Sequence, residues 1–328
     1  MESAAFSKYD GGNASKTGIM NSNNLSQSSR RKFLQTTALA AAAASPLFAA
    51  EEKKSTTGNS VCVFNKPLQH LSYEEQAKLV AEMGFAGIEG TVRKGGHVVP
   101  EKVKSDLPKQ IKALRDNQVD MTLMTTDINN ADDAINRDVL ETAAGLGVKR
   151  FRMRPYKYDY SRPLPEQLKE FGGTYEKLVE YCTGLGIRPL YQNHAGAKYF
   201  GASLWDLYLL MKDLPVEQVG ICFDIRHATA EGGLSWPTQF HLMRPFFGFV
   251  YCKDFLWDVE KKKPYNVPLG TGMVNYPQFF SMLKRSGYDG PISLHMEYKD
   301  HRDPALQDES IKVIREDMSS LQKLMADA

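Results

Sequence analysis

Ionisable side chains follow short apolar runs at regular intervals along this chain of 328 residues. Some form pairs two positions apart, such as Tyr251 with Lys253 and His295 with Glu297. Because side chains alternate between the two faces of a strand, both members of each pair point to the same side. Two such groups facing a barrel interior are unfavourable unless they are paired, hydrated or metal-bound. The spacing therefore predicts a polar site where several strands end.

The same pattern recurs after most of the apolar runs. The polar residues at these predicted strand ends are Lys66, Glu89, Arg93, His97, Arg152, Arg154, Gln192, Asn193, His194, Asp224, Arg226, His227, Lys253, Asp254, His295 and Glu297. Any one of them alone is more often a satisfied polar group than a catalyst. Carboxylates, imidazoles and lysines gathered in one place suit general acid–base chemistry. Arg152 and Arg154 either bind substrate or balance carboxylates, whereas His70, His241 and His301 are predicted to lie on the surface or in loops.

The elements that must position these residues alternate regularly from residue 60 onward. Strands are predicted over residues 61–64, 87–89, 121–124, 150–153, 187–192, 219–223, 249–252 and 292–296. Helices are predicted over residues 72–83, 103–114, 134–146, 168–185, 204–211, near 240, 276–284 and 311–325, the first opened by a capping box of Ser72 and Glu75.

Eight strand–helix units predict an α/β fold, a single-domain (β/α)₈ TIM barrel over residues 60–328, with its site at the C-terminal ends of the strands. The alternative is an open doubly wound sheet. That fold would call for a glycine-rich phosphate turn after the first strand, and the residues at 64–67, Phe-Asn-Lys-Pro, do not provide one.

The composition excludes several classes of protein. The chain is 42% hydrophobic and 24% charged, with a net charge of +2 and acids and bases interspersed. It has no basic run typical of nucleic-acid binding. Beyond the leader, no apolar stretch reaches the roughly 20 residues of a membrane span. We therefore expect a small-molecule substrate, with no nucleic-acid partner and no membrane association of the mature protein.

Residues 1–50 are predicted to be a leader outside the barrel. Residues 29–34, Ser-Arg-Arg-Lys-Phe-Leu, precede an alanine-rich run that ends in small residues near 50. This order is similar to a twin-arginine signal and implies export, for example to the periplasm. Either the polar stretch at 1–28 is a disordered extension, or translation starts at Met20.

The four cysteines show no Cys-x-x-Cys spacing, and three of them fall in predicted strands. A buried free cysteine behaves as a small hydrophobic residue. We expect neither a disulfide nor a zinc-thiolate site.

Several segments together resemble the xylose isomerase-like TIM barrels, which include sugar phosphate isomerases and epimerases. The resemblance covers roughly residues 60–298. The segments that carry it are Gly-Phe-Ala-Gly-Ile-Glu at 84–89, Gln-Asn-His-Ala-Gly at 192–196, Phe-Asp-Ile-Arg-His at 223–227, Lys-Asp at 253–254, Pro-Leu-Gly-Thr-Gly at 268–272 and Gly-Tyr-Asp-Gly-Pro-Ile-Ser at 287–293.

The resemblance implies a divalent cation held by Glu, Asp, His and Glu on strands five to eight, and frequent pairing into homodimers. Here Gln192, Tyr251 and His295 stand at three of those positions, and Asp224 is kept. Two interpretations follow. A shifted set of Gln192, Asp224, His295 and Glu297 holds Mn, Mg, Co or Zn, or the site has lost the metal and kept its acid–base residues.

The family's chemistry implies a role for each residue. Glu297 or His295 takes a proton from the carbon next to a sugar carbonyl, His227 and Asp224 orient substrate or metal, and Lys253 polarises the carbonyl. The residues expected to bind substrate are Lys66, Glu89, Arg93, Arg152, His194 and Trp257. The outcome is isomerisation or epimerisation through an enediolate. The alternatives are a lyase that eliminates the aglycone of a 3-keto-glycoside, and a barrel that binds a sugar or cyclitol without turnover.

Overall fold

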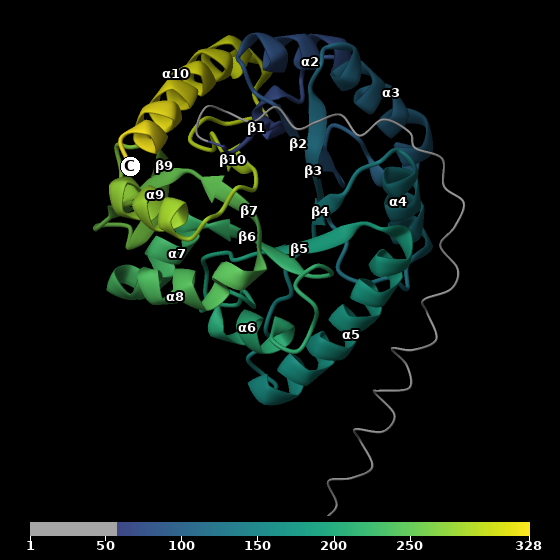
Figure 1. Ribbon diagram of the computed structural model, residues 1–328, viewed down its shortest axis with the longest axis vertical. Coiled ribbons are helices and arrows are strands. Elements are labelled where there is room, and N and C mark those ends of the chain that lie inside the picture. Colours follow the sequence, from purple (N-terminus) through teal and green to yellow (C-terminus); the bar gives the residue numbers. More distant parts are fainter. Residues whose placement is uncertain (1–57) are drawn as a thin grey trace, which may run out of the picture. The chain divides into compact units, whose positions relative to one another are not determined.

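The computed structural model describes residues 58–328, so the predicted leader and twin-arginine motif lie outside the described residues. The described part is a closed barrel of parallel strands in the order β1-β10-β7-β6-β5-β4-β3-β2, surrounded by helices (Figure 1). The first and last barrel strands pair in register, with Val61 opposite Ile292, and this pairing closes the barrel. The predicted (β/α)₈ barrel is confirmed.

The barrel strands are β1 (Val61–Phe64), β2 (Gly87–Val92), β3 (Asp120–Thr126), β4 (Arg150–Arg152), β5 (Arg188–Gln192), β6 (Gly220–Asp224), β7 (Phe247–Cys252) and β10 (Ile292–Leu294). The helices are α2 (Tyr73–Glu82), α3 (Val103–Asp116), α4 (Ala134–Gly145), α5 (Leu164–Leu185), α6 (Trp205–Met211), α7 (Ile225–Gly232), α8 (Trp236–Met243), α9 (Tyr276–Arg285) and α10 (Gln307–Ala326). A two-stranded sheet, β8 (Asp254–Asp258) with β9 (Lys263–Val267), lies outside the barrel.

Local sequence signals account for several element boundaries. The Ser72 hydroxyl accepts from the Glu75 amide and the Glu75 carboxylate accepts from the Ser72 amide, so the predicted capping box starts α2. Gly186 ends α5 in the left-handed conformation, at φ 68°, where a side chain would be strained. Gly87 lets β2 approach β3, because a Cβ there would lie 2.0 Å from the Asp120 carbonyl oxygen. Each boundary therefore has a local steric or hydrogen-bonding cause.

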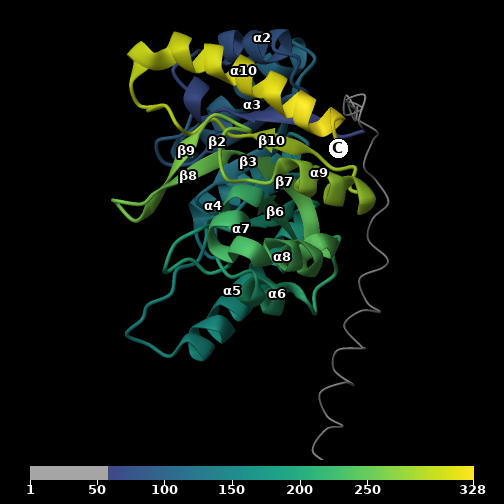
Figure 2. The ribbon, with the colours of Figure 1, turned by 90° about the vertical axis from the view of Figure 1, so that its left-hand side faces the viewer.

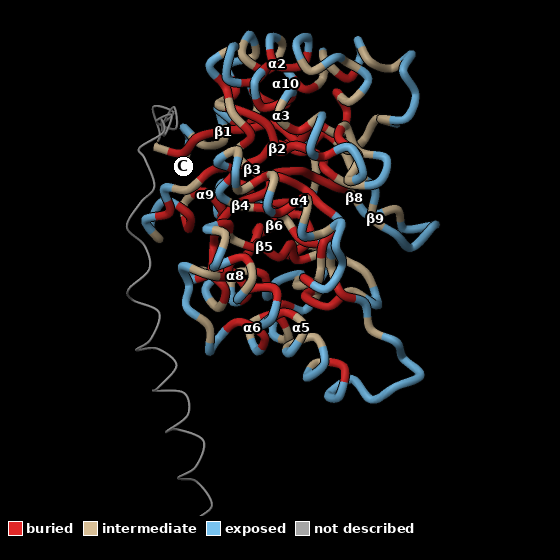
Figure 3. Tube along the Cα trace, turned by 90° about the vertical axis from the view of Figure 1, so that its right-hand side faces the viewer, coloured by how far each residue is buried: buried red, intermediate tan, exposed pale blue. Residues whose placement is uncertain are grey.

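An apolar core packs against each of the two faces of the barrel strands. The larger lies between the strands and the helices, and buried segments run through the centre of the molecule beneath an exposed outer layer (Figure 3). The smaller fills the barrel interior and consists of Cys62, Leu123, Leu190, Cys222, Phe249 and Tyr251. Alternation then places Gln192, Asp224 and Lys253, each two residues beyond an inner-core residue, on the same inward side nearer the strand ends. Packed apolar side chains of the barrel interior therefore lie directly beneath the polar site.

The structure differs from the sequence prediction around β6, β7 and β10. A helix that was not predicted, α7, follows Asp224 directly, with the Asp224 carboxylate capping it through the His227 amide. Residues 258–268 form the tip and second strand of the antiparallel β8–β9 hairpin, which was not predicted and which projects from the barrel (Figure 2). Strand β10 ends at Leu294, two residues early.

All four cysteines are buried free thiols, and burial raises the pKa of Cys62 and Cys182 to about 12. Within residues 58–328, the helices are too short or too polar to cross a membrane.

The last helix carries a buried carboxylate. Asp317 on α10 accepts from the Leu269 amide at 3.0 Å and from the Tyr298 hydroxyl at 3.0 Å. Burial raises the pKa of Asp317 to about 6 even though both donors favour the anion. Between its ordinary value of 3.8 and about 6, the folded chain therefore holds a proton that the unfolded chain has released.

Replacing this carboxylate is expected to change how stability depends on pH. As pH rises from about 4 to about 6, Asp317 lowers the free energy of unfolding by up to roughly 3 kcal/mol. The free energy of unfolding of Asp317→Asn should not show this decrease. Urea unfolding of both proteins across this range measures the difference. The matched control is Asp308→Asn, on the exposed side of the same helix. A wild-type-minus-Asp317→Asn difference that stays constant with pH would contradict the expectation.

Candidate active site

A buried glutamate from β2 forms the lower layer of the site. Glu89 is fully buried and accepts hydrogen bonds from the His295 ring at 2.7 Å, the Tyr251 hydroxyl at 2.8 Å and the Ser293 hydroxyl at 2.9 Å. The Thr125 hydroxyl from β3 donates a further one. These donors come from β3, β7 and β10 or the residue just after it, so Glu89 on β2 ties four strands together inside the barrel.

Glu89 is an anion at neutral pH. Burial opposes its ionisation, but the charge and hydrogen bond of His295, with Arg152 and Thr125, hold the pKa of Glu89 down to about 2. An ionised carboxylate only accepts hydrogen bonds, so the ring nitrogen of His295 that faces it, Nε2, carries the proton. The His295 ring is also stacked on Phe64, with centroids 4.6 Å apart, and lies 4.2 Å from the Tyr251 ring.

A lysine between two carboxylates forms the upper layer. The Nζ of Lys253 lies 2.8 Å from Glu297 Oε2 and 3.1 Å from Asp224 Oδ2. The Nζ of Lys66, just beyond β1, lies 3.6 Å from the other oxygen of Glu297. Burial favours the neutral amine of Lys253, but Asp224 and Glu297 raise its pKa above the ordinary value. Burial would likewise raise the pKa of Glu297, yet Lys253, His295 and Lys66 hold it well below its usual range.

These groups differ in how far a solute can reach them. The side chains of Asp224 and Glu89 are 0% exposed and that of Lys253 is 5% exposed, whereas those of Glu297 and Lys66 are 19% and 25% exposed. Among these three carboxylates, a substrate entering from the strand ends therefore meets Glu297 first.

Neighbouring side chains use both oxygens of Asp224. Gln192 Nε2 donates to Asp224 Oδ2 at 2.8 Å, and Arg152 Nη1 donates to Gln192 Oε1 at 2.6 Å. The His227 amide donates to Asp224 Oδ1 at 3.0 Å. The Asn193 side chain bonds both backbone groups of Asp224. The position of Asp224 is thus determined by its hydrogen bonds.

Two stacked histidines line the site beside Asp224. The rings of His194 and His227 lie 4.3 Å apart. Burial, reinforced by Lys253, lowers the pKa of His194 to about 4 and that of His227 well below its usual range, so both rings are neutral. Arg226 Nη1 donates to His227 Nδ1 at 3.0 Å, so the proton of His227 is on Nε2. That nitrogen is buried and makes no hydrogen bond, with Asp224 Oδ2 3.5 Å away, so its N–H is available to a substrate oxygen.

The structure places the predicted residues in two layers, beside the Phe64 ring and on the β8–β9 hairpin. Lys66, Arg152, Gln192, His194, Asp224, His227, Lys253 and Glu297 form the upper layer, connected by the contacts above. Glu89 and His295 lie beneath it. Arg93 and Arg152 both stack over Phe64, each 6.0 Å from the ring centroid. Trp257 lies on the β8–β9 hairpin and is 46% exposed.

His97 and Arg154 differ from their strand-end neighbours. The His97 ring bonds the side-chain nitrogens of Gln76 and Gln110 and the Leu71 carbonyl, so all its polar atoms are used between β2 and helices α2 and α3. Arg154 is exposed. The geometry therefore gives His97 a structural role.

Several site residues were not singled out from the sequence. Thr125 and Ser293 were missed although strand alternation places both inward. Phe64 was missed because a phenylalanine in a strand reads as core. Asn266, whose Nδ2 donates to the Glu297 carbonyl at 3.3 Å, was missed because its strand was not predicted.

The residues at the family's metal positions do not fit a divalent cation. Tyr251 and His295 both donate to Glu89, and the Gln192 amide oxygen accepts from Arg152. The ammonium of Lys253 already lies between Asp224 and Glu297. Within residues 58–328, no group of three or more His, Cys, Asp or Glu side chains is arranged to hold a metal ion.

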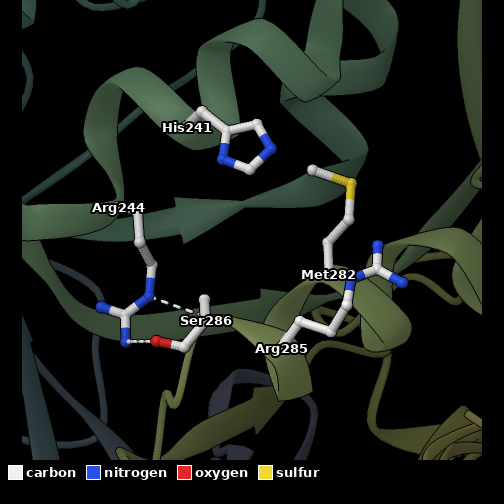
Figure 4. Close-up of a pocket in the computed structure, with 5 residues that line it drawn as sticks. All are labelled: His241, Arg244, Met282, Arg285 and Ser286. Atoms are coloured by element: carbon white, nitrogen blue, oxygen red, sulfur yellow. Dashed lines mark hydrogen bonds between the residues drawn. The ribbon is translucent and has the colours of Figure 1, made fainter.

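A small surface pocket lies away from this site. It measures about 300 Å³ and is lined by His241, Arg244, Met282, Arg285 and Ser286 (Figure 4). Arg244 Nε donates to the Ser286 hydroxyl at 2.7 Å and Nη2 to its carbonyl at 2.9 Å. Both residues precede a strand, so the pocket belongs to the N-terminal end of the barrel. Arg244 ties α9 to the start of β7 there.

One curated protein is similar in sequence to about half of the chain. An uncharacterized protein of Methanocaldococcus jannaschii is 26% identical over 170 residues, which is 50% of this chain and 56% of that protein. The match thus spans little more than half of that relative's length.

Solved structures are similar over most of the barrel. The IOLI protein with a zinc atom has a TM-score of 0.64 at 15% identity, covering 81% of this chain and 98% of its own. An E. coli 3-keto-D-glucoside 4-epimerase has a TM-score of 0.61 at 17% identity, covering 81% and 99%. A xylose isomerase domain protein of Planctomyces limnophilus has a TM-score of 0.59 at 15% identity, covering 76% and 93%. At these identities the similarity is one of fold.

A model of one protein family also matches most of the chain. It is described as the xylose isomerase-like TIM barrel, and the match runs from residue 77 to residue 323. The closed barrel, the polar site at its strand ends and this match agree. The chain belongs to the xylose isomerase-like TIM barrel family.

Proposed function

We propose that this protein is a sugar isomerase or epimerase that removes the proton next to a carbonyl and passes through an enediolate. One observation carries the proposal: Glu297, an ionised and accessible carboxylate, lies within 2.8 Å of the buried ammonium of Lys253. The reaction needs an ionised base to take the proton and a fixed positive charge near the oxygen that becomes negative; Lys253 keeps Glu297 ionised and supplies that charge. The epimerases among the structural neighbours support this class of chemistry.

Glu297 is the base in this proposal. His295 is 2% exposed, stacked between two rings and bonded to Glu89, which leaves it little access to a substrate. Glu297 takes the proton from carbon, and the electron pair moves to the carbonyl oxygen. In an isomerisation the proton then goes to the former carbonyl carbon, while the adjacent hydroxyl passes its proton to the former carbonyl oxygen. In an epimerisation a proton from solvent is added to the opposite face of the same carbon, and Glu297 releases its proton to solvent. Lys253 and Lys66 balance the negative charge that moves onto oxygen.

The other polar groups bind the hydroxyls of the sugar. The Nε2 of His227 and the Nε of Arg152 are buried without hydrogen-bond partners among the described residues. Leaving a buried donor unsatisfied costs about 1–3 kcal/mol, so substrate oxygens bound there recover that energy. Asp224, held by four neighbours, acts as the fixed support of Lys253 and His227.

The test is proton exchange in deuterated water. The full chain is incubated with ketohexoses, ketopentoses and 3-keto-glycosides, and NMR follows loss of the proton next to the carbonyl. Exchange together with a new isomer or epimer supports the proposal. Binding of a sugar or cyclitol by calorimetry, with no exchange on any of these substrates, would replace it with a barrel that binds without turnover.

A lyase acting on 3-keto-glycosides is the second candidate, and the hairpin favours it. Trp257 and Asn266 lie on the same face of the β8–β9 hairpin, and Asn266 contacts the Glu297 backbone. An exposed aromatic ring at the mouth of the site suits stacking on an aglycone or second sugar ring. In the same NMR experiment, release of a free aglycone from the 3-keto-glycoside distinguishes the lyase from the epimerase.

We also propose that the chain is exported by the twin-arginine route, on the strength of Arg30 and Arg31. In a bacterium with this route, changing both to Lys is expected to leave the uncleaved precursor inside the cytoplasm, whereas the wild type reaches the periplasm. Cell fractionation with immunoblotting measures this. Arg302→Lys, in the barrel, is the control. Equal export of both variants would contradict the proposal.

A further inference from the structure

The ammonium of Lys253 occupies the position between two carboxylates that a bridging cation would take. Its Nζ contacts Asp224 Oδ2 at 3.1 Å and Glu297 Oε2 at 2.8 Å, and its side chain is 5% exposed. The two acids come from β6 and from just beyond β10, which are the sixth and eighth strands of the barrel. These are two of the strand ends at which the resemblance implies metal ligands.

The remaining oxygens and nitrogens nearby are committed elsewhere. The amide of Gln192 turns its nitrogen to Asp224 and its oxygen to Arg152. Tyr251 and His295 turn their donor atoms to Glu89. Metal ligands must instead direct lone pairs at one shared point.

The negative charges of the upper layer are already neutralised. Asp224 and Glu297 contribute two negative charges, Lys253 and Lys66 contribute two positive ones, and Arg152 adds a further positive charge. A divalent cation entering this layer would lie beside two ammonium groups, which repel it. Both the donor atoms and the charge thus oppose a metal here.

We propose that the ammonium of Lys253 is a built-in replacement for the divalent cation, so that this chain binds its substrate and works without a metal. The role of this ammonium in stabilising charge during turnover rests on the proposed function. That Lys253 occupies the cation position is independent of the proposed function. In turnover, the carbon–hydrogen bond breaks to Glu297, the electron pair goes to the carbonyl oxygen, and Lys253 remains protonated throughout. No electron is gained or lost overall.

The first test measures metal in the wild-type full chain. Elemental mass spectrometry is expected to find far less than one equivalent of Mn, Co, Ni, Zn or Mg after dialysis. The thermal midpoint is expected to be unchanged by a chelator and by added Mn²⁺. Stoichiometric metal together with a chelator-dependent midpoint would overturn the proposal.

The second test creates the site that the lysine fills. Lys253→Met removes the charge while keeping much of the side chain's length, and Gln192→Glu in the same chain adds a third carboxylate. This double variant is expected to bind Mn²⁺ at least 10-fold more tightly than the wild type by calorimetry, and to gain thermal stability from it. Lys66→Met is the matched control. It also removes a positive charge that contacts Glu297, but it leaves Lys253 between the two carboxylates. Wild-type Mn²⁺ affinity equal to that of the double variant would overturn the proposal.

The two proposals fail in different ways. Turnover that requires an added divalent metal overturns the role of Lys253 and leaves the isomerase or epimerase proposal standing. A metal-free wild type that exchanges no proton on any sugar overturns the isomerase or epimerase proposal and leaves Lys253 standing as the group in the cation position. If the double variant does not fold, the metal content of the wild type decides the matter.

Discussion

Glu297→Gln is expected to lower the rate of proton exchange by about 10²–10⁴-fold, the usual contribution of a positioned general base. The amide has nearly the same shape as the carboxylate and cannot take a proton from carbon. Sugar affinity should change much less, because the groups predicted to bind hydroxyls stay in place. The measurement is kcat for NMR-detected exchange in deuterated water, with calorimetry for binding.

Two further variants make this result specific. Glu260→Gln makes the same chemical change at an exposed residue in the hairpin turn, and it should exchange like the wild type. His295→Gln removes the rival base. If exchange survives in Glu297→Gln within a few-fold and is lost in a folded His295→Gln protein, then His295 is the base and Glu297 is not.

Glu89→Ala is expected to lower the free energy of unfolding by about 3–5 kcal/mol, because each of several buried donors left without an acceptor costs about 1–3 kcal/mol. The change leaves the His295 and Tyr251 donors without their acceptor and opens a cavity between four strands. Glu89→Gln keeps the volume, but its amide nitrogen would face hydroxyl and ring donors. We expect it to be destabilised as well. Urea unfolding at neutral pH measures both.

The pH dependence separates this charge effect from a simple cavity. The folded pKa of Glu89 is about 2, below its ordinary 4.5, so its stabilisation is complete above about 4.5 and is lost as pH falls toward 2. The stability gap between wild type and Glu89→Ala should therefore narrow over that range. Glu82→Ala, which breaks an exposed pair with Lys78, should change stability by less than about 0.5 kcal/mol. If the stability difference between wild type and Glu89→Ala does not decrease as pH falls, lost packing alone accounts for the destabilisation.

The amino-acid sequence alone predicts the fold class and the end of the barrel that carries the polar cluster. Apolar runs alternating with helical periodicity carry that information locally, as in the capping box of Ser72 and Glu75. Alternation within strands also identified the inward pairs, such as Tyr251 with Lys253 and His295 with Glu297. Neither signal depends on which residues meet across the barrel.

The pairing of the polar groups follows from how the strands come together in the closed barrel. His295 and Glu89 are 206 positions apart, and each had other candidate partners of opposite character in the same barrel. Closure of the barrel brings them into contact below the site, while Lys253 comes between Asp224 and Glu297 above it. The balance between such pairings depends on burial and distance, which no local pattern encodes. For the same reason the sequence did not show whether the site binds a metal. A carboxylate is available to a cation only if no lysine from another strand is paired with it.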